Sequence, residues 1–371
     1  MASPTTDQAD RLARAVLRQR LRVKPKEDVT IETYPSSLPW ATGFVREARR
    51  LGAHPLLLYE DERSYWTAVE DGRASVVGSP GAHEWAALRN SDVYVYFWGP
   101  EGLNRLRRLP ERTSEQLTAF NSKWYQLARK AGVRGARMGI ARVSEANARL
   151  FGAALGPWRS KVLEASMRDP AELRPAAQRV AGRLERGKTV RIRHPNGTDL
   201  TLALAGRTPN LSLGEVTPQT QATPFGSMAS VPDASVYVAV DESTADGTFV
   251  ANRTTTTPYD APLAGGRFVF RDGRMVRASF RSGGAGFRSA FGGAGEGRDR
   301  PSFVEVGLDP ELGAVPMLEE AEAGAVTVGI GRNAGFGGTT EVGFMSYLTL
   351  SGATLSIDGA PLVRRGRVMA R

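Results

Sequence analysis

The sequence has no cysteine and few histidines: its 371 residues include three, His54, His83 and His194. The absence of cysteine excludes disulfide bonds, thiolate catalysis and cysteine-ligated zinc. Because no histidine follows residue 194, residues 195–371 have no imidazole that could bind a metal or act as a base. His54 and His194 lie in "GAHPL" and "RHPNG", which are typical turn sequences, so we interpret both as turn residues.

Long apolar runs are missing as well. No segment approaches the roughly 20 consecutive apolar residues that cross a bilayer. Residues 1–21 also lack the apolar core of a secretory signal, and we interpret residues 5–21 as a capped amphipathic helix. We therefore expect a cytoplasmic protein that makes no membrane contact.

Negative charge is scarce relative to positive charge. The 49 lysines and arginines exceed the 39 aspartates and glutamates, which gives a formal net charge of +10. This excess permits binding to nucleic acid, and basic residues concentrate in segments 103–112, 183–194 and 364–371. The alternative is that these segments are solvated helix and hairpin surfaces. Residues 281–301 are rich in glycine and arginine without periodicity, which predicts a surface loop that could also contact RNA.

Residues 1–168 alternate between strand and helix patterns. Short β-rich runs occur at 28–34, 54–60, 91–98 and 136–141, and amphipathic helical patterns occur at 5–21, 38–53 and 113–133. This alternation predicts an α/β domain with a doubly wound, mostly parallel sheet. No GxGxxG motif or P-loop is present, so a nucleotide-binding role for this domain has no support. A helical pattern at 169–187 is expected to connect this domain to the next.

Residues 188–371 have a different pattern, with most of the glycines and none of the six tryptophans. Alternating runs flank Asn196-Gly197, Asp272-Gly273 and Asp358-Gly359, dipeptides that favour two-residue β-hairpin turns. This second domain is therefore predicted to be rich in β-structure and largely antiparallel. The whole chain is predicted to combine an α/β domain with a β-rich domain.

Several short motifs occur in a fixed order along the second domain. They are "GTDL" (197–200), "NLSLGEV" (210–216), "DGTFVANR" (246–253), "RFVFRDGRMV" (267–276), "EVGLDPELG" (305–313), "EEAEAGAVTVGIGRN" (319–333) and "IDGAPLVRRGR" (357–367). With residues 38–58, this series resembles the aminopeptidase T (leucyl aminopeptidase) family of thermophilic-type metallopeptidases. The resemblance implies the two-domain architecture predicted above, usually as a homodimer, with a peptide as ligand.

The resemblance also implies two divalent metal ions in the C-terminal domain, held by two glutamates, two histidines and an aspartate, with an assisting tyrosine. Glu215 and Glu320 match the two glutamates. The other positions have changed: a histidine is replaced by Thr327, the tyrosine by Ala334, and the His-x-Asp pair by Met345 and Tyr347. We therefore expect no metal cofactor, the alternative being Mg²⁺ or Mn²⁺ at a carboxylate-only site. The segment that contains residues 225–230 is longer than the corresponding segment of the family pattern. We therefore expect an insertion there, near the metal cleft.

Three hypotheses about function remain open. The first is a non-catalytic protein for binding or assembly, in which the metal site has degenerated. The second is a divergent peptidase or other hydrolase, in which Glu215 and Glu320 act as base or as ligands of a hard divalent metal. The third is a basic protein associated with nucleic acid. A serine hydrolase mechanism has no support, because no GxSxG motif is present.

Overall fold

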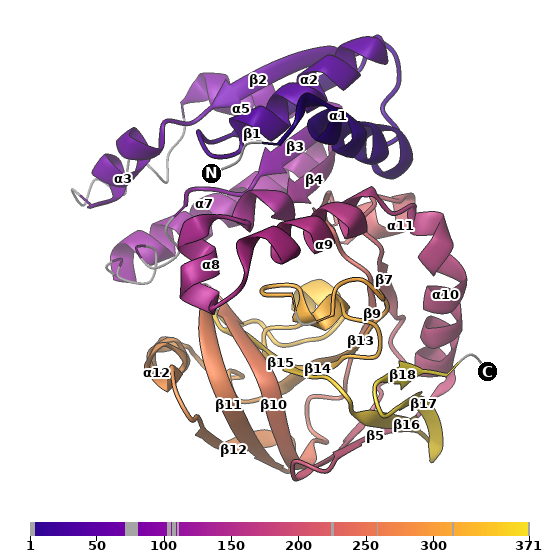
Figure 1. Cartoon of the computed structure of the whole chain (residues 1–371). Helices are drawn as coiled ribbons and strands as arrows, with labels where there is room; N and C mark the ends of the chain where they lie inside the picture. The colour runs from indigo at the N-terminus through magenta and orange to yellow at the C-terminus, as the bar shows by residue number, and fades with distance from the viewer. Residues whose placement is uncertain are drawn as a thin grey trace. The chain divides into compact units, whose positions relative to one another are not determined.

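A computed structural model of the chain (Figure 1) describes residues 4–70, 81–101, 105, 109, 111–223, 226–257, 259–313 and 315–369. The chain divides into two compact units. Unit 1 contains Met1–Pro170 and Gly214–Asp233, and unit 2 contains Ala171–Leu213 and Ala234–Arg371. Among the helices described, none is long and apolar enough to span a bilayer.

A five-stranded, all-parallel sheet forms the centre of unit 1, with the strand order β2-β1-β3-β4-β8. Its strands are β1 (Asp28–Thr33), β2 (His54–Tyr59), β3 (Val93–Phe97), β4 (Arg134–Met138) and β8 (Met228–Val231). Its helices are α1 (Thr6–Arg14), η1 (Ala15–Arg20), α2 (Leu38–Arg50), α3 (Glu62–Glu70), α5 (Ala82–Arg89), α7 (Glu111–Lys130), η2 (Gly139–Arg142), α8 (Glu145–Phe151), α9 (Leu155–Met167) and α11 (Pro218–Gln221). The predicted parallel sheet is confirmed.

Helices cover both faces of this sheet, because alternate residues of a strand point to opposite sides. The ring of Phe97 on β3 lies 5.1 Å from that of Phe44 on α2. Tyr94, on the same strand but the other face, lies 5.1 Å from Trp124 on α7. The helices that follow β1 and β3 therefore lie on opposite faces of the sheet.

The last strand of the parallel sheet comes from an unexpected part of the chain. Residues 214–233 follow the first strands of unit 2 in sequence, yet Met228 pairs with Gly135 and makes β8 the neighbour of β4. The sequence predicts this segment to belong to the C-terminal domain and residues 225–230 to be an insertion, whereas Met228–Val231 form a strand of the parallel sheet. Because β8 has only four residues, it gives too short a pattern to be distinguished from a loop.

Unit 2 is organised around a 13-stranded sheet in which all the paired strands are antiparallel. Its strands are β5 (Thr189–His194), β6 (Thr198–Ala203), β7 (Asn210–Ser212), β9 (Ser235–Ala239), β10 (Asp246–Thr257), β11 (Tyr259–Arg271), β12 (Arg274–Ser279), β13 (Pro301–Gly307), β14 (Val326–Gly331), β15 (Met345–Leu350), β16 (Thr354–Ile357), β17 (Ala360–Arg364) and β18 (Arg367–Val368). Its helices are α10 (Pro170–Arg186), α12 (Gly284–Gly293), η3 (Glu319–Ala321) and η4 (Ala334–Phe336). The predicted antiparallel architecture is confirmed.

The hairpins of unit 2 lie at the predicted turns. Asp272 and Gly273 join β11 to β12, and Asp358 and Gly359 join β16 to β17, each pair with positive φ at both residues. A two-residue turn of this kind requires positive φ at both positions, which explains the Asp-Gly sequence. Asn196-Gly197 lies between β5 and β6, which also pair as predicted.

The prediction of a surface loop at residues 281–301 is wrong for much of its length. The ten residues of α12 lie within it, beside β10 and β11 (Figure 1). Phe287 on this helix is 2% exposed and packs 5.7 Å from Phe268 of β11, ring centre to ring centre. Phenylalanines at 287 and 291, four residues apart, share one helix face, and the surrounding glycines concealed this signal.

Candidate functional site

Two neighbouring strands of unit 2 bring together three of the positions that the family resemblance assigns to the metal centre. Thr327 on β14 is paired with Thr349 on β15, and Met345 and Tyr347 lie at alternate positions before Thr349. Paired residues share a face of a sheet, as do residues two apart on a strand. The side chains of Thr327, Met345 and Tyr347 therefore lie on the same face.

A hydrogen bond between two buried hydroxyl groups occupies the centre of this face. The Oγ1 atoms of Thr327 and Thr349 are 2.9 Å apart, and Thr327 is 0% exposed. A buried hydroxyl without a partner costs about 1–3 kcal/mol. The pairing therefore stabilises Thr327 inside the strand without any further ligand.

Four aromatic rings fill the space beside the threonine pair, and we refer to them as the aromatic cluster: Tyr237, Phe303, Phe336 and Tyr347. The Phe303 ring lies 5.3 Å from Tyr347 and 5.4 Å from Phe336, centre to centre. It also covers Gly329, because a Cβ atom at Gly329 would lie 2.3 Å from the Phe303 ring. Tyr347, which replaces a carboxylate ligand in the family pattern, is thus part of an aromatic contact network.

The loop after β14 carries Ala334, the position of the family tyrosine, and also Phe336 of the aromatic cluster. Asn333 fixes this loop from a fully buried position. Its amide donates to the carbonyl oxygen of Ser302 at 3.1 Å, and its Oδ1 accepts from the backbone amide of Thr340 at 2.8 Å. Ala334 therefore lies on a short turn whose two ends are joined by one side chain.

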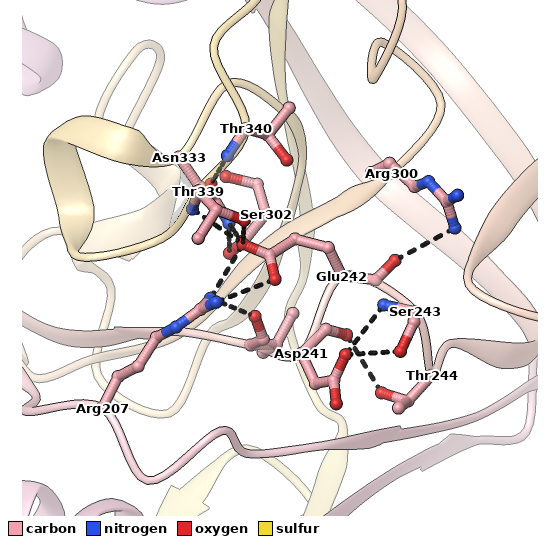
Figure 2. Close-up of polar contacts among 11 residues, drawn as sticks. Arg207, Asp241, Glu242, Ser243, Thr244, Arg300, Ser302, Asn333, Thr339 and Thr340 are labelled. Carbon is pink, nitrogen blue, oxygen red and sulfur yellow. Dashed lines mark hydrogen bonds and ion pairs between the residues drawn. The ribbon is translucent and has the colours of Figure 1, made fainter.

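An ion pair holds Asn333 in turn (Figure 2). Glu242, which follows β9, accepts two hydrogen bonds from Arg207 at 2.9 and 2.8 Å, one from Asn333 at 2.7 Å and one from the Thr339 amide at 3.0 Å. Burial raises the pKa of Glu242, but the hydrogen bonds from Arg207, Asn333 and Thr339 outweigh it and hold the pKa at about 2. Glu242 is therefore ionised and ties the loop to two other segments of unit 2.

Glu320, one of the two predicted glutamates, lies on η3, before β14. The backbone of η3 packs on the end of β13, since a Cβ at Gly307 would lie 2.4 Å from the Glu320 carbonyl oxygen. Its side chain is half-buried. Glu320 is thus in unit 2 with the threonine pair, but on a turn rather than on the strands that carry it.

Glu215, the other predicted glutamate, belongs to unit 1. Its carboxylate is paired with Arg22 at 3.1 Å, and the Glu215 side chain is 5% exposed. The neighbouring Gly214 carbonyl accepts from Arg20 at 3.2 Å, and Arg20 is 2% exposed. Arg20 and Arg22 thus contact Gly214 and Glu215, respectively, from the N-terminal part of unit 1.

A buried glutamate on β13 was missed by the sequence analysis. Glu305 is 5% exposed and is the strand partner of Thr327 on one side and of Tyr237 on the other. Its side chain therefore shares the face that holds the threonine pair. The sequence signal was a single glutamate between two valines in an apolar run. Every residue of this strand is buried, and burying a carboxylate is costly unless it is paired or neutral.

The substituted family positions on this face do not fit a pair of catalytic divalent metals, although Glu305 adds one carboxylate to the same face. Thr327 is hydrogen bonded to Thr349, Met345 offers a thioether that suits soft metals, and Tyr347 packs among aromatic rings. Across the part of the chain that the structure describes, no three His, Cys, Asp or Glu side chains are grouped so that they could hold a metal ion.

Comparison with known proteins gives a likeness of fold. No protein-family model and no curated protein matches the sequence. The structure of AmpT, aminopeptidase T from Thermus thermophilus, has a TM-score of 0.73 and 18% identity, over 98% of this chain and 99% of that chain. The structure of 2,5-dihydroxypyridine dioxygenase from Pseudomonas putida KT2440 has a TM-score of 0.65 and 15% identity, over 99% of both chains. The chain therefore has an aminopeptidase T-like fold, as its motif order predicted.

Proposed function

We propose that this protein acts by binding rather than by metal-dependent hydrolysis, as a non-catalytic protein built on the aminopeptidase T-like fold. The observation that carries the proposal is the packing of the substituted positions. Thr327 is paired with Thr349, and Tyr347 contacts Phe303. These contacts support a binding role, because Thr327 and Tyr347 are engaged with other side chains of unit 2.

The proposal predicts that divalent metals neither bind tightly nor restore hydrolysis. We expect no turnover of leucine 4-nitroanilide or of a dipeptide panel by untagged protein supplied with Mn²⁺, Co²⁺, Zn²⁺ or Mg²⁺. A ligand at 100 times its dissociation constant stabilises a protein by about 2.7 kcal/mol. In scanning calorimetry, adding Mg²⁺ or Mn²⁺ should therefore not raise the unfolding temperature.

The competing hypothesis, a hydrolase that uses a carboxylate-only Mg²⁺ or Mn²⁺ site, makes the opposite prediction. It requires metal-dependent turnover that Glu215→Ala or Glu320→Ala abolishes. The matched control is Glu296→Ala, because Glu296 is exposed. Activity lost in the first two variants and retained in the third would replace the binding proposal by the hydrolase.

A second candidate function, nucleic-acid binding, is favoured by exposed arginines on one face of unit 2. Arg193 (β5) and Arg277 (β12) are the two ends of a row of paired residues that crosses β6, β10 and β11 through Asp199, Thr248 and Val269. Further exposed arginines on these strands are Arg191, Arg267, Arg271 and Arg274. Of the basic segments predicted from sequence, 183–194 contributes to this face, 364–371 is described except for its last two residues, and 103–112 lies largely outside the described residues.

Nucleic-acid binding of this kind should be strongly dependent on salt. Each phosphate contact contributes about 0.9 to the slope of log affinity against log salt for duplex DNA. The double variant Arg193→Glu/Arg277→Glu should therefore reduce the slope by about 2. Arg11→Glu, at an exposed position of unit 1, is the control. A salt-independent affinity, or equal slopes in the two variants, would exclude this function.

The oligomeric state and the ligand are inferred from the proposed function. A binding protein of this fold is expected to be a homodimer or larger homo-oligomer and to take a peptide as ligand. Light scattering on the purified chain measures the first, and a monomer at all concentrations would contradict it.

A further inference from the structure

At the carboxyl edge of the parallel sheet in unit 1, partly exposed polar side chains lie on one face. Glu32, Tyr96, Arg137 and Ser230 are paired in sequence across β1, β3, β4 and β8. Each is the last residue but one of its strand. These four residues, which we call the edge row, therefore share one face at the end of the sheet where the strands finish.

The opposite face at the same edge is closed. The final residues of the same four strands, Thr33, Phe97, Met138 and Val231, are between 0% and 1% exposed. Glu32, Tyr96 and Arg137 are half-buried and keep surface that a small molecule can reach. The contrast between the two faces at one edge indicates that the polar side has a role other than packing.

The edge row lies beside the point where the strand order reverses, between β1 and β3. From β1 the chain continues to β2 on one side, and β3 lies on the other side of β1. The following helices, α2 and α7, lie on opposite faces, as Phe44 and Trp124 show. In open α/β sheets, ligands bind outside the carboxyl ends of the strands at such a switch point.

Arg137 supplies a cation at this edge of the sheet. Its Nη2 donates to Ser230 Oγ at 3.1 Å, while its buried Nε has no partner among the described residues. The guanidinium lies 5.7 Å from the Trp98 ring and 5.9 Å from the Tyr125 ring. Arg142 also stacks on Trp98, at 4.2 Å. This part of the edge combines positive charge with aromatic faces, which suits a planar anion.

Glu32 supplies a carboxyl group at the other end of the row, two strands from Arg137, or about 10 Å along the sheet. Tyr94 donates a short hydrogen bond to it. The groups that face it are Tyr34, Tyr94, Tyr96, Glu60 and Glu84. Burial raises the pKa of Glu32 to about 7, opposed by the Tyr94 hydrogen bond and reinforced by Glu60 and Glu84. Burial also raises the pKa of Tyr34, Tyr94 and Tyr96, so these tyrosines stay neutral.

We propose that the edge row of unit 1 is a binding site for a small aromatic carboxylate. Arg137 binds the carboxylate of the ligand, the ring lies against Trp98 and Tyr96, and Glu32 faces the far end of the ring. A deprotonated Glu32 repels the anion, whereas a protonated Glu32 accepts it. The site is contained in unit 1 and does not depend on the threonine pair or the aromatic cluster of unit 2.

The test is isothermal titration calorimetry of the full chain with benzoate, and with benzamide as the uncharged analogue. Benzoate should bind and benzamide should bind at least about tenfold more weakly. Arg137→Gln should weaken benzoate at least about tenfold, and Arg137→Lys, which keeps the charge, should weaken it less. Arg129→Gln, at an exposed position on α7, is the control for total charge.

The pH dependence separates this site from a merely structural role of Glu32. With half-protonation near pH 7, the fraction of protonated Glu32 changes about tenfold from about pH 8 to about pH 6, so benzoate affinity should rise by up to that factor. In Glu32→Gln, which keeps an acceptor for Tyr94, the affinity should be flat over this range. Absence of saturable benzoate binding, equal binding of benzamide, or a pH dependence retained in Glu32→Gln would overturn the proposal.

Discussion

Replacing Glu242 by glutamine should lower the free energy of unfolding of unit 2 by about 3 kcal/mol at neutral pH, because it leaves the Arg207 guanidinium without its counter-charge. The side chains of Arg207 and Glu242 are 18% and 15% exposed, so water replaces little of the lost ion pair. Glutamine also has a single acceptor oxygen for Asn333, Thr339 and Arg207. Scanning calorimetry measures the loss, and hydrogen exchange of residues 332–344 localises it to the loop that carries Ala334 and Phe336.

The same effect should depend on pH in one direction. The pKa of Glu242 is about 2 in the folded chain, against an ordinary value of 4.5. A carboxyl whose pKa is lowered by folding contributes stability that is complete above its unfolded pKa and is lost as the pH falls toward its folded pKa. The difference between wild type and Glu242→Gln should therefore be constant above about pH 5.5 and shrink toward zero near about pH 2.

A second ion pair in unit 2 provides the control for both measurements. Arg191 and Asp199 make a two-bonded pair at 2.8 and 2.7 Å, but their side chains are 52% and 53% exposed. Asp199→Asn should cost less than about 1 kcal/mol, since exposed ion pairs contribute little. Equal losses in Glu242→Gln and Asp199→Asn would show that burial of the Arg207–Glu242 pair has no energetic consequence.

Replacing Arg20 by methionine should destabilise unit 1 by about 3–5 kcal/mol, because several buried carbonyl groups lose their donor at once. Arg20 donates to the carbonyl oxygens of Ala165, Ser166, Arg168 and Gly214 at 2.7 to 3.2 Å. Methionine fills much of the same volume but donates nothing. The loss should also release the segment that holds Glu215, which follows Gly214.

Tryptophan fluorescence measures this change selectively, because all six tryptophans lie in unit 1. The urea midpoint should fall at an unchanged slope. Arg11→Met is the matched control: Arg11 lies on α1, is 53% exposed and forms an ion pair with Asp7 four residues away, a contact worth about 0.3–0.5 kcal/mol. If Arg20→Met and Arg11→Met unfold at the same urea concentration, the buried hydrogen bonds of Arg20 do not stabilise unit 1.

Much of the architecture was determined by local pattern. Strands β1 and β3 are buried β-rich runs, and each Asp-Gly turn requires a backbone conformation that few other dipeptides adopt. The motif order also predicted the aminopeptidase T-like fold, which the likeness to AmpT supports. Thr327, Met345 and Tyr347, which the sequence assigns to the family's site positions, lie on one face of neighbouring strands.

Other features depend on pairing between distant segments, which no local pattern contains. The short strand β8 pairs with the edge of β4, and Phe287 and Phe291 of α12 pack against the buried ring of Phe344. Both override weak local preferences through tertiary contacts.

The residues that meet at the candidate site also depend on pairing between distant segments. The sequence determined which ligand types are missing, because no histidine follows His194. Only the tertiary structure decided what replaces them, since the register of β13, β14 and β15 places Glu305 beside Thr327 and Thr327 beside Thr349. Register is set by long-range packing of the whole sheet, so residues 22 positions apart become hydrogen-bonded partners that sequence alone does not identify.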